Sequence, residues 1–162
     1  MMEAEVAASE IDTPTGRVRA VSDGEAIVQV TWTATVTNAA AVPEDAVSRE
    51  TAAQLRAYFD GRLTAFDIPL KFRGGSEFER AIWQAMLDIP WGETRSYGDL
   101  AALSGGVARA VGGACGRNPI PIIVPCHRVV GSGGKLVGFS GAEGVATKQW
   151  LLDFERGQAR LF

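Results

Sequence analysis

Hydrophobic and polar positions alternate in the first part of the chain. Residues 16–37 are rich in β-branched side chains, and the pair Asp23-Gly24 interrupts the alternation. Two alternating runs on either side of an Asp-Gly pair predict a β-hairpin. Residues 38–47 show no such pattern, and we expect a loop there.

The pattern becomes helical at Ser48. Apolar side chains then recur with helical spacing at Leu55, Tyr58 and Phe59. This period predicts a helix that Asp60-Gly61 closes. Residues 70–75 have no periodicity and contain two glycines, so we interpret them as a linker between an α/β part and a mostly helical part. The expected domains are residues 1–72 and 73–162.

The second half opens with a helix signal. Ser76 and Glu79 have the spacing of a capping box, in which each side chain bonds the backbone N–H of the other residue. The apolar stripe that follows ends before Pro90, and Trp91-Gly92 predicts a turn. The stripe consists of Phe78, Ile82, Ala85 and Met86.

Two short helices come next. Ser96, with Asp99 three residues later, predicts a helix through Leu103. Gly105-Gly106 predicts a turn, and residues 107–116 predict the second helix. Two short helices around a tight turn form a helix-turn-helix, a motif used for DNA and also for ordinary helical packing.

The second of these helices has two distinct faces. The face expected to be buried carries Val107, Val111, Ala114 and Cys115. The opposite face carries Arg109, Gly112, Gly113 and Gly116. Glycine in a helix interior costs about 1 kcal/mol against alanine, so this face needs a reason. Close approach of another backbone is one reason, and tight helix packing around a surface arginine is the other.

Composition and charge add a partner signal. The chain is 46% hydrophobic and 22% charged, as in soluble globular proteins. Its net charge is −3, but residues 1–70 hold five arginines and eleven acidic residues, whereas residues 71–162 hold eleven basic and eight acidic residues. This asymmetry favours a DNA partner for the second half, with a modest electrostatic contribution.

Several classes of protein are not expected. No apolar run approaches the length of a membrane span, and the acidic N-terminus does not resemble a secretory signal. A cytoplasmic protein with both cysteines reduced is expected, associated with the nucleoid if the source is prokaryotic. One histidine and two cysteines make no credible zinc set, so we expect no metal and no cofactor. Nothing indicates an oligomer, and a monomer is expected.

The reactive chemistry gathers in one segment. Cys126 is followed directly by His127, the only histidine, and by Arg128, after an apolar run that Pro125 closes. A thiol has a pKa of about 8.5 and needs a proton acceptor and positive surroundings to become a good nucleophile. A neighbouring imidazole that takes the proton can make the thiolate the major form. An inert buried cysteine beside a satisfied histidine is equally consistent with these residues alone.

The C-terminal helix carries ionisable groups on an apolar stripe. Lys148, Leu151, Leu152 and Glu155 share one face at helical spacing. Charged groups beside two leucines lie either at the margin of a core or within a functional site.

Taken together, these residues resemble the O6-alkylguanine-DNA alkyltransferases, which reverse alkylation damage directly. The resemblance covers residues 76–155 and only loosely the first 70. The stretches that carry it are Phe78 to Pro90, Gly92 to Tyr97, Arg109 to Ala114, Asn118-Pro119, Pro125 to Val129, Ser140-Gly141 and Lys148 to Leu152. It implies a ribonuclease-H-like α/β domain followed by a mostly helical, winged-helix-like domain with the helix-turn-helix.

The resemblance also implies a single, irreversible transfer of the alkyl group from O6-alkylguanine, with O4-alkylthymine left open as a second substrate. Cys126 would be the acceptor, and His127 would withdraw its proton through a water, oriented by Glu155. Tyr97 would help to protonate the leaving guanine, with Lys148 nearby.

Further roles follow from the same resemblance. Asn118 would fix the turn that presents the active-site strand, and Arg109 would fill the gap left by the flipped base. Residues implied to contact double-stranded DNA are Arg109, Tyr97, Gly112, Gly113, Arg117 and Arg128. Those implied to hold the base are Val129, Ser140 and Phe139.

Three other functions remain open at this point. One is a damage sensor that binds alkylated DNA without transfer, although such proteins carry another residue in place of Cys126. Another is a thiol hydrolase acting on a small molecule, which leaves the glycine face around Arg109 unexplained. The third is a helix-turn-helix regulator whose cysteine is incidental.

Overall fold

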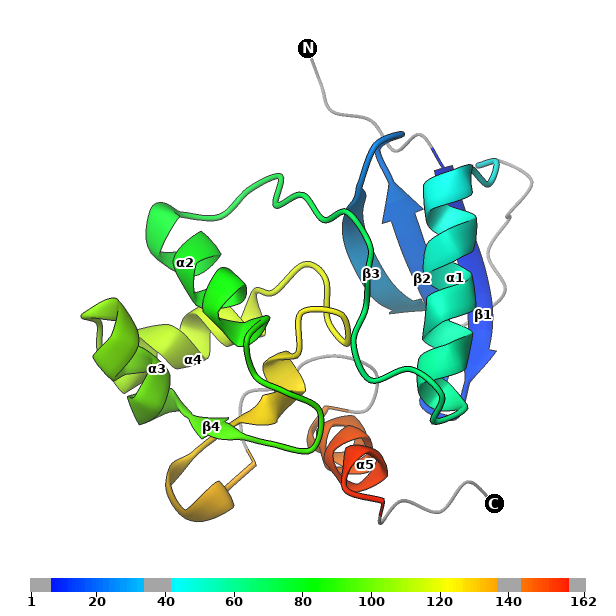
Figure 1. Cartoon of the computed structure of the whole chain (residues 1–162). Helices are drawn as coiled ribbons and strands as arrows, with labels where there is room; N and C mark the ends of the chain where they lie inside the picture. The colour runs from blue at the N-terminus through cyan, green and yellow to red at the C-terminus, as the bar shows by residue number, and fades with distance from the viewer. Residues whose placement is uncertain (1–6, 34–41, 137–143, 158–162) are drawn as a thin grey trace. The chain divides into compact units, whose positions relative to one another are not determined.

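The computed structural model describes residues 7–33, 42–136 and 144–157 (Figure 1). The chain divides into two compact units, Met1–Arg73 and Gly74–Phe162. The first unit is built around a sheet and the second is mostly helical. This arrangement agrees with the expected order of an α/β part followed by a helical part.

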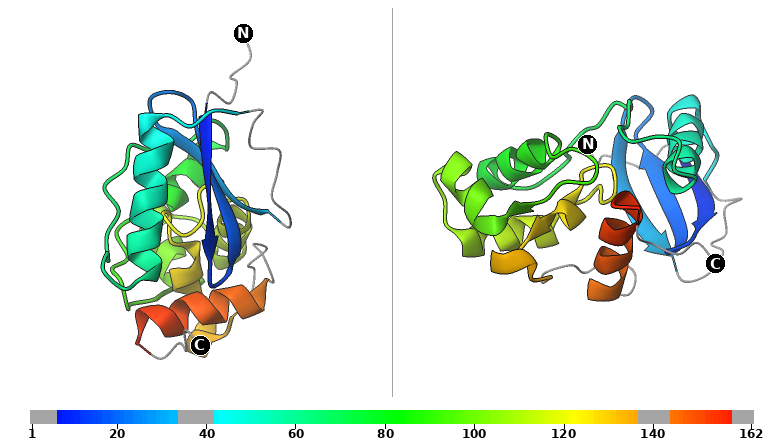
Figure 2. Two further views of the ribbon diagram at one scale, coloured as in Figure 1. Left: turned by 90° about the vertical axis from the view of Figure 1, so that its right-hand side faces the viewer. Right: turned by 60° about the horizontal axis from the view of Figure 1, so that its bottom comes forward.

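The first unit holds a three-stranded antiparallel sheet with one helix, α1 (Ala46–Phe59), along one face (Figure 2). The strands are β1 (Ala7–Thr13), β2 (Gly16–Ser22) and β3 (Ile27–Thr33), in the order β1-β2-β3. The predicted hairpin is confirmed as β2 and β3, and the Asp23 carboxylate accepts from two backbone N–H groups of its turn. β1 is an addition that the sequence did not predict, because its short Ala, Ser and Glu side chains alternate weakly.

Helix α1 starts slightly earlier than predicted. Asp45 is its N-cap, and the Ser48 hydroxyl accepts from the Asp45 N–H while the Asp45 carboxylate accepts from the Ser48 N–H. Ser48 therefore stands inside the first turn rather than at its start. Within the predicted linker, the Lys71 N–H donates to the Ile27 carbonyl, so this part of the segment is attached to β3.

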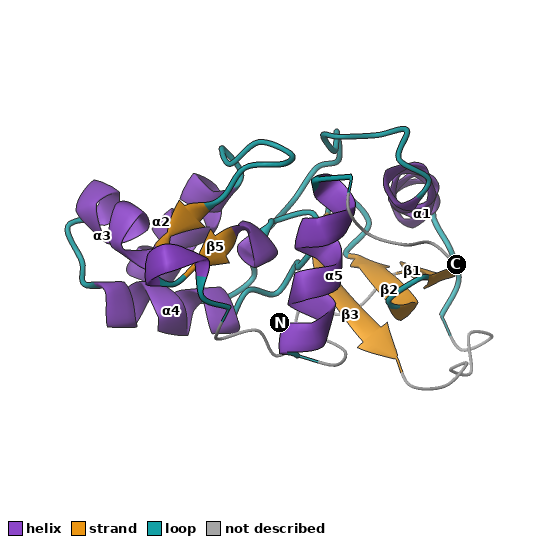
Figure 3. Cartoon of the chain, turned by 90° about the horizontal axis from the view of Figure 1, so that it is seen from below, coloured by secondary structure: helices purple, strands orange, loops and turns teal. Residues whose placement is uncertain are grey.

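Four helices form most of the second unit: α2 (Glu77–Met86), α3 (Tyr97–Ser104), α4 (Ala108–Gly116) and α5 (Val145–Glu155). The capping boxes at Ser76 and Ser96 are confirmed. Two strands of two residues each, β4 (Arg95–Ser96) and β5 (Val129–Val130), pair in parallel (Figure 3). This pair was not predicted, because two residues carry no periodicity.

Two adjacent glycines make the turn between α3 and α4, for different reasons. Gly105 has a φ of +77°, a left-handed conformation that side chains rarely adopt. A Cβ on Gly106 would lie 2.7 Å from a ring carbon of Phe78. The turn is therefore tight both in its backbone and in its packing against α2.

Helix α4 differs from the prediction at its first residue. Val107 is the N-cap rather than a helical residue, and it is 65% exposed instead of buried. Val111, Ala114 and Cys115 form the buried face as expected.

Candidate active site

The chain segment between α4 and the reactive residues is held in place by the side chain of Asn118, just beyond the end of α4. Its Nδ2 donates to the Val124 carbonyl at 2.8 Å, and its Oδ1 accepts from the Ile120 N–H at 2.9 Å. The prolines of this segment cannot donate, so the amide supplies bonds that they remove. Ile122 has a φ of +72°, an uncommon conformation for a β-branched residue, so the backbone here is strained.

A single 3-10 turn, η2 (Cys126–Arg128), holds the three reactive residues side by side. Cys126 is 7% exposed, and its N–H donates to the Val124 carbonyl at 2.8 Å. Burial raises the pKa of the Cys126 thiol, against the hydrogen bond from Asn118 and the charge of Lys148. The thiol is therefore neutral at rest, so of the two states that the sequence left open the structure favours the protonated one.

His127 is fully buried and bonds to Glu155 on α5. Its Nε2 lies 2.7 Å from Glu155 Oε2, so the carboxylate accepts the Nε2–H and the imidazole keeps its lone pair on Nδ1. Within the described part of the chain, Nδ1 is buried without a hydrogen-bond partner. Burial lowers the pKa of His127, against the hydrogen bond and charge of Glu155, so the ring is neutral and can accept a proton.

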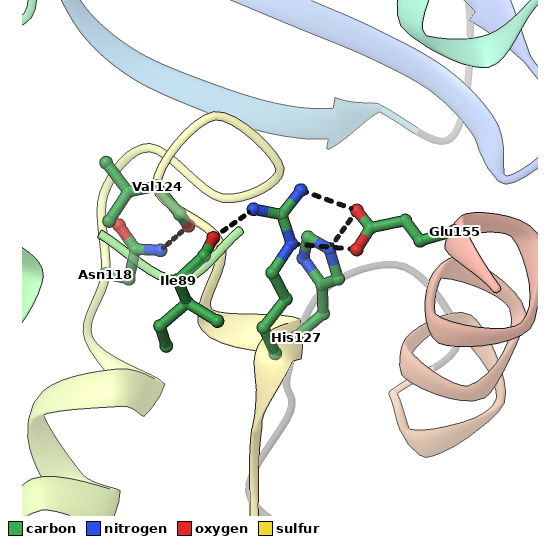
Figure 4. Close-up of polar contacts among 6 residues, drawn as sticks. Ile89, Asn118, Val124, His127 and Glu155 are labelled. Carbon is green, nitrogen blue, oxygen red and sulfur yellow. Dashed lines mark hydrogen bonds and ion pairs between the residues drawn. The ribbon is translucent and has the colours of Figure 1, made fainter. Parts of the chain in front are cut away.

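Glu155, which Figure 4 shows beside His127, also accepts from Arg128. Burial alone would raise the pKa of Glu155, but the hydrogen bonds from His127 and Arg128, with the charge of Arg128, outweigh it and lower the pKa to about 2. The carboxylate is thus ionised throughout the physiological range. It is a fixed acceptor for the imidazole.

Tyr97 and Lys148 form a second buried pair. The Lys148 Nζ donates to the Tyr97 hydroxyl at 3.2 Å and lies 5.5 Å from the centre of the tyrosine ring. Burial raises the pKa of Tyr97 to about 12, with added contributions from the Cys115 and Cys126 thiols. Burial lowers the pKa of Lys148. Tyr97 therefore keeps its proton and can donate it.

Residues predicted to contact DNA lie in different environments. Arg109 is exposed on α4, and Gly112 and Gly113 are partly exposed on the same helix. Arg117 is exposed and forms an ion pair with Glu79 of α2.

Arg128 departs from its predicted place among the DNA contacts. It is 6% exposed, and its guanidinium bonds protein groups rather than facing solvent. Of the predicted base-pocket residues, Val129 is buried in β5, whereas Phe139 and Ser140 lie outside the described residues.

No helix among the described residues is long and apolar enough to cross a membrane. No group of three or more His, Cys, Asp and Glu side chains in those ranges is arranged to hold a metal ion. The two cysteines, Cys115 and Cys126, are free thiols.

Two family models match the chain, one over each unit. Residues 77–157 match the DNA-binding domain of 6-O-methylguanine DNA methyltransferase, and residues 7–72 match its ribonuclease-like domain. The chain belongs to the 6-O-methylguanine DNA methyltransferase family. The resemblance noted in the sequence is thereby confirmed.

Individual members of this methyltransferase family are also similar. The methylated-DNA–protein-cysteine methyltransferase of Mycobacterium tuberculosis is 55% identical over 108 residues, which cover 65% of this chain and 64% of the relative. The alignment thus spans slightly less than two thirds of that relative. The corresponding Mycobacterium leprae protein is 52% identical over 119 residues, covering 72% and 70% of the two chains.

Solved structures of the methyltransferase family extend the similarity along the chain. The crystal structure of the Mycobacterium tuberculosis O6-methylguanine methyltransferase matches with a TM-score of 0.81 and 40% identity, covering 96% of each chain. The same organism's OGT in complex with DNA matches with a TM-score of 0.84 and 42% identity over the same shares.

Sequence reasoning on this family member missed two parts of the site. It did not predict that Arg128 hydrogen-bonds to Glu155, nor that the same guanidinium donates to the Ile89 carbonyl. The available signal was the position of Arg128 close behind the apolar run that Pro125 closes.

Proposed function

We propose that the protein repairs O6-alkylguanine in double-stranded DNA by transferring the alkyl group to Cys126, once and irreversibly. The observation that carries the proposal is the buried chain of groups beside the thiol. His127 bonds to an ionised Glu155 through Nε2 and keeps Nδ1 as a buried acceptor. A metal is not needed for this chemistry, because a thiol and a base are sufficient.

The transfer is a displacement at the alkyl carbon. The Cys126 Sγ attacks that carbon, the S–C bond forms and the C–O6 bond breaks, and its electron pair passes to the guanine. Nδ1 of His127 receives the thiol proton through a water, while Glu155 holds the imidazole. Tyr97, with its hydroxyl held by Lys148, supplies a proton to the leaving guanine. Because the thiol and the imidazole are neutral at rest, proton removal accompanies the attack.

The base must leave the helical stack to reach a thiol that is buried. Flipping costs a few kcal/mol. Arg109, exposed on α4, would occupy the gap, and the small Gly112 and Gly113 would let the DNA backbone come close. Arg117 would add a phosphate contact at the end of the same helix. Val129, Phe139 and Ser140 would border the flipped base.

The finer description of the fold belongs to the same proposal. Residues 1–72 would form a reduced ribonuclease-H-like domain, and residues 73–162 a winged-helix-like domain around the α3–α4 helix-turn-helix. We propose that the protein acts as a monomer, because one chain carries every group that the reaction uses. Repair requires access to the genome, so association with the nucleoid is expected in a prokaryotic source.

A mass measurement tests the proposal. The protein is incubated with duplex DNA containing one O6-methylguanine, and the intact mass and peptide masses are recorded. We expect one added methyl group per molecule, on the peptide that contains Cys126, and none in Cys126→Ser. Cys115→Ser is the matched control, because it removes the other thiol and should still accept one methyl group. Bound DNA with an unmodified Cys126 would indicate a sensor, and repeated turnover would indicate a different thiol enzyme.

A further inference from the structure

Arg128 has an environment that DNA binding does not explain. Its Nε donates to Glu155 Oε1 at 2.8 Å and its Nη2 to Glu155 Oε2 at 3.0 Å. Its Nη1 donates to the carbonyl of Ile89 at 2.5 Å. Three donors of one buried guanidinium are thus committed to protein acceptors.

This geometry fixes the carboxylate in two ways. Two parallel bonds define the plane and direction of the Glu155 carboxylate, which one bond would leave free to rotate. The third bond ties the guanidinium to the chain that follows α2, since Ile89 lies three residues beyond Met86. Arg128 therefore holds Glu155 Oε2, the oxygen that accepts from His127, and is itself anchored to the backbone that follows α2.

We propose that Arg128 is a positioning residue for the alkyl transfer, acting through Glu155 to hold the His127 imidazole with Nδ1 available to take the thiol proton. The inference rests on the proposed function, because it assigns a purpose to the imidazole. Arg128 is not a catalytic residue in this account, since it acts on the base through another side chain.

Charges around His127 give the inference a second consequence. From α5, Glu155 favours protonation of the ring and Lys148 opposes it; Arg128, beside it in η2, also opposes it. The Tyr97 hydroxyl of α3 accepts a hydrogen bond from Lys148, and Cys126 directly precedes His127 in the chain. Removing Arg128 while Glu155 remains makes the ring easier to protonate, so the base is lost at a higher pH.

The first experiment is a double-mutant cycle on single-turnover repair at saturating duplex DNA. We expect Arg128→Met to slow methyl transfer by about ten- to a hundredfold, as misplacement of a catalytic group does. Arg128→Lys should recover part of the rate, because an ammonium keeps the charge without the fork. If Arg128 acts through Glu155, Arg128→Met combined with Glu155→Gln should be no slower than the slower single variant.

The second experiment does not depend on DNA repair. The rate at which iodoacetamide modifies Cys126, read from the peptide mass, is measured against pH for the folded protein. We expect the acid limb of this profile to move to higher pH in Arg128→Met and to stay nearer the wild type in Arg128→Lys. Arg62→Met removes an arginine from an exposed ion pair with Asp60 and should leave the profile unchanged.

The outcomes are distinguishable. The positioning role would be overturned if the rate losses of the two single variants multiply in the double variant. It would also be overturned if Arg128→Met leaves the pH profile of Cys126 modification unshifted and lowers the repair rate by no more than the fraction of the variant that is unfolded. If the wild-type protein accepts no methyl group, the proposed function fails, and the iodoacetamide profile still decides whether Arg128 controls the imidazole.

Discussion

Glu155 shows at the scale of one residue how burial and partners compete. Its carboxylate is removed from water, which costs free energy, and is then given donors from His127 and Arg128. The balance lies with the ionised form, as the lowered pKa indicates. A carboxylate in this position stabilises the fold only while its charge is present.

The pH dependence of stability follows from that balance. The folded pKa of Glu155 is lowered to about 2 from an ordinary value of 4.5, so its stabilisation is complete above the unfolded pKa and is lost as pH falls toward 2. The full loss is on the order of 3 kcal/mol, at about 1.4 kcal/mol for each pKa unit. We expect urea unfolding, followed by tryptophan fluorescence, to show a smaller drop in stability between pH 5 and pH 3 for Glu155→Gln than for the wild type. Glu77→Gln on exposed α2 surface should match the wild type, and equal drops in all three would contradict the assignment.

The sequence predicted only some of the contacts among the expected site residues. Cys126, His127 and Glu155 were expected to act together, and the structure brings His127 and Glu155 within hydrogen-bond distance. The resemblance to the alkyltransferases implied that Arg128 contacts DNA, whereas its side chain is buried. Its burial depends on a carboxylate 27 residues away and on a backbone carbonyl, neither of which a local pattern reveals.

At the scale of elements, α4 combines a buried apolar face with a face of small residues. Among the described residues, a Cβ on Gly112 would have only the Tyr97 ring within 4 Å, at 4.0 Å, and a Cβ on Gly113 would meet the flexible end of Arg117. Packing inside the protein therefore does not require glycine at position 112. This observation favours an external reason for it, such as close approach of DNA.

Gly112→Ala separates the two reasons for the small face. We expect the variant to be more stable by about 1 kcal/mol, because alanine favours the helix, and to bind duplex DNA several-fold more weakly. Thermal unfolding and fluorescence anisotropy with a labelled duplex measure the two effects. Gly98→Ala on α3 is the matched control, and should not weaken binding. Unchanged affinity in Gly112→Ala would leave the glycine face without a role in DNA contact.

Helices were predicted more fully than strands. The capping boxes and apolar stripes of α2 and α3 extend over several residues and are read from local spacing. The parallel pair of β4 and β5 joins segments more than thirty residues apart, so its existence depends on the tertiary fold. The sequence also misplaced Val107. A helix that begins one residue later than predicted leaves Val107 at the N-cap, outside the buried face of α4.

The two parts of the chain differ in secondary structure and in net charge. Acidic residues exceed basic ones in residues 1–70, and the reverse holds in residues 71–162, which contain the helix-turn-helix and the reactive turn. The groups proposed for DNA contact and for transfer all lie in the second unit. Gly74 and Gly75, at the start of that unit, are exposed.

Limited proteolysis tests this division. We expect trypsin to cut first after Arg73, where exposed glycines follow, and to leave two fragments that resist further digestion. Mass spectrometry of a time course identifies the order of cuts. Arg73→Gln should remove the early cut and lengthen the lifetime of the full chain. An earlier cut at Arg62 or inside α2 would contradict the boundary.

The compactness of the turn η2 has a consequence for protein engineering. Three consecutive residues hold the proposed acceptor Cys126, the proposed base His127 and Arg128, and the C-terminal helix supplies Glu155, which bonds to His127 and Arg128. Moving this chemistry to another scaffold would therefore require a short turn and one correctly placed helix, together with a backbone carbonyl in the place of Ile89 and a proton donor in the place of Tyr97. The same economy makes the turn intolerant of insertion, since one extra residue between Cys126 and Arg128 would displace all three roles together.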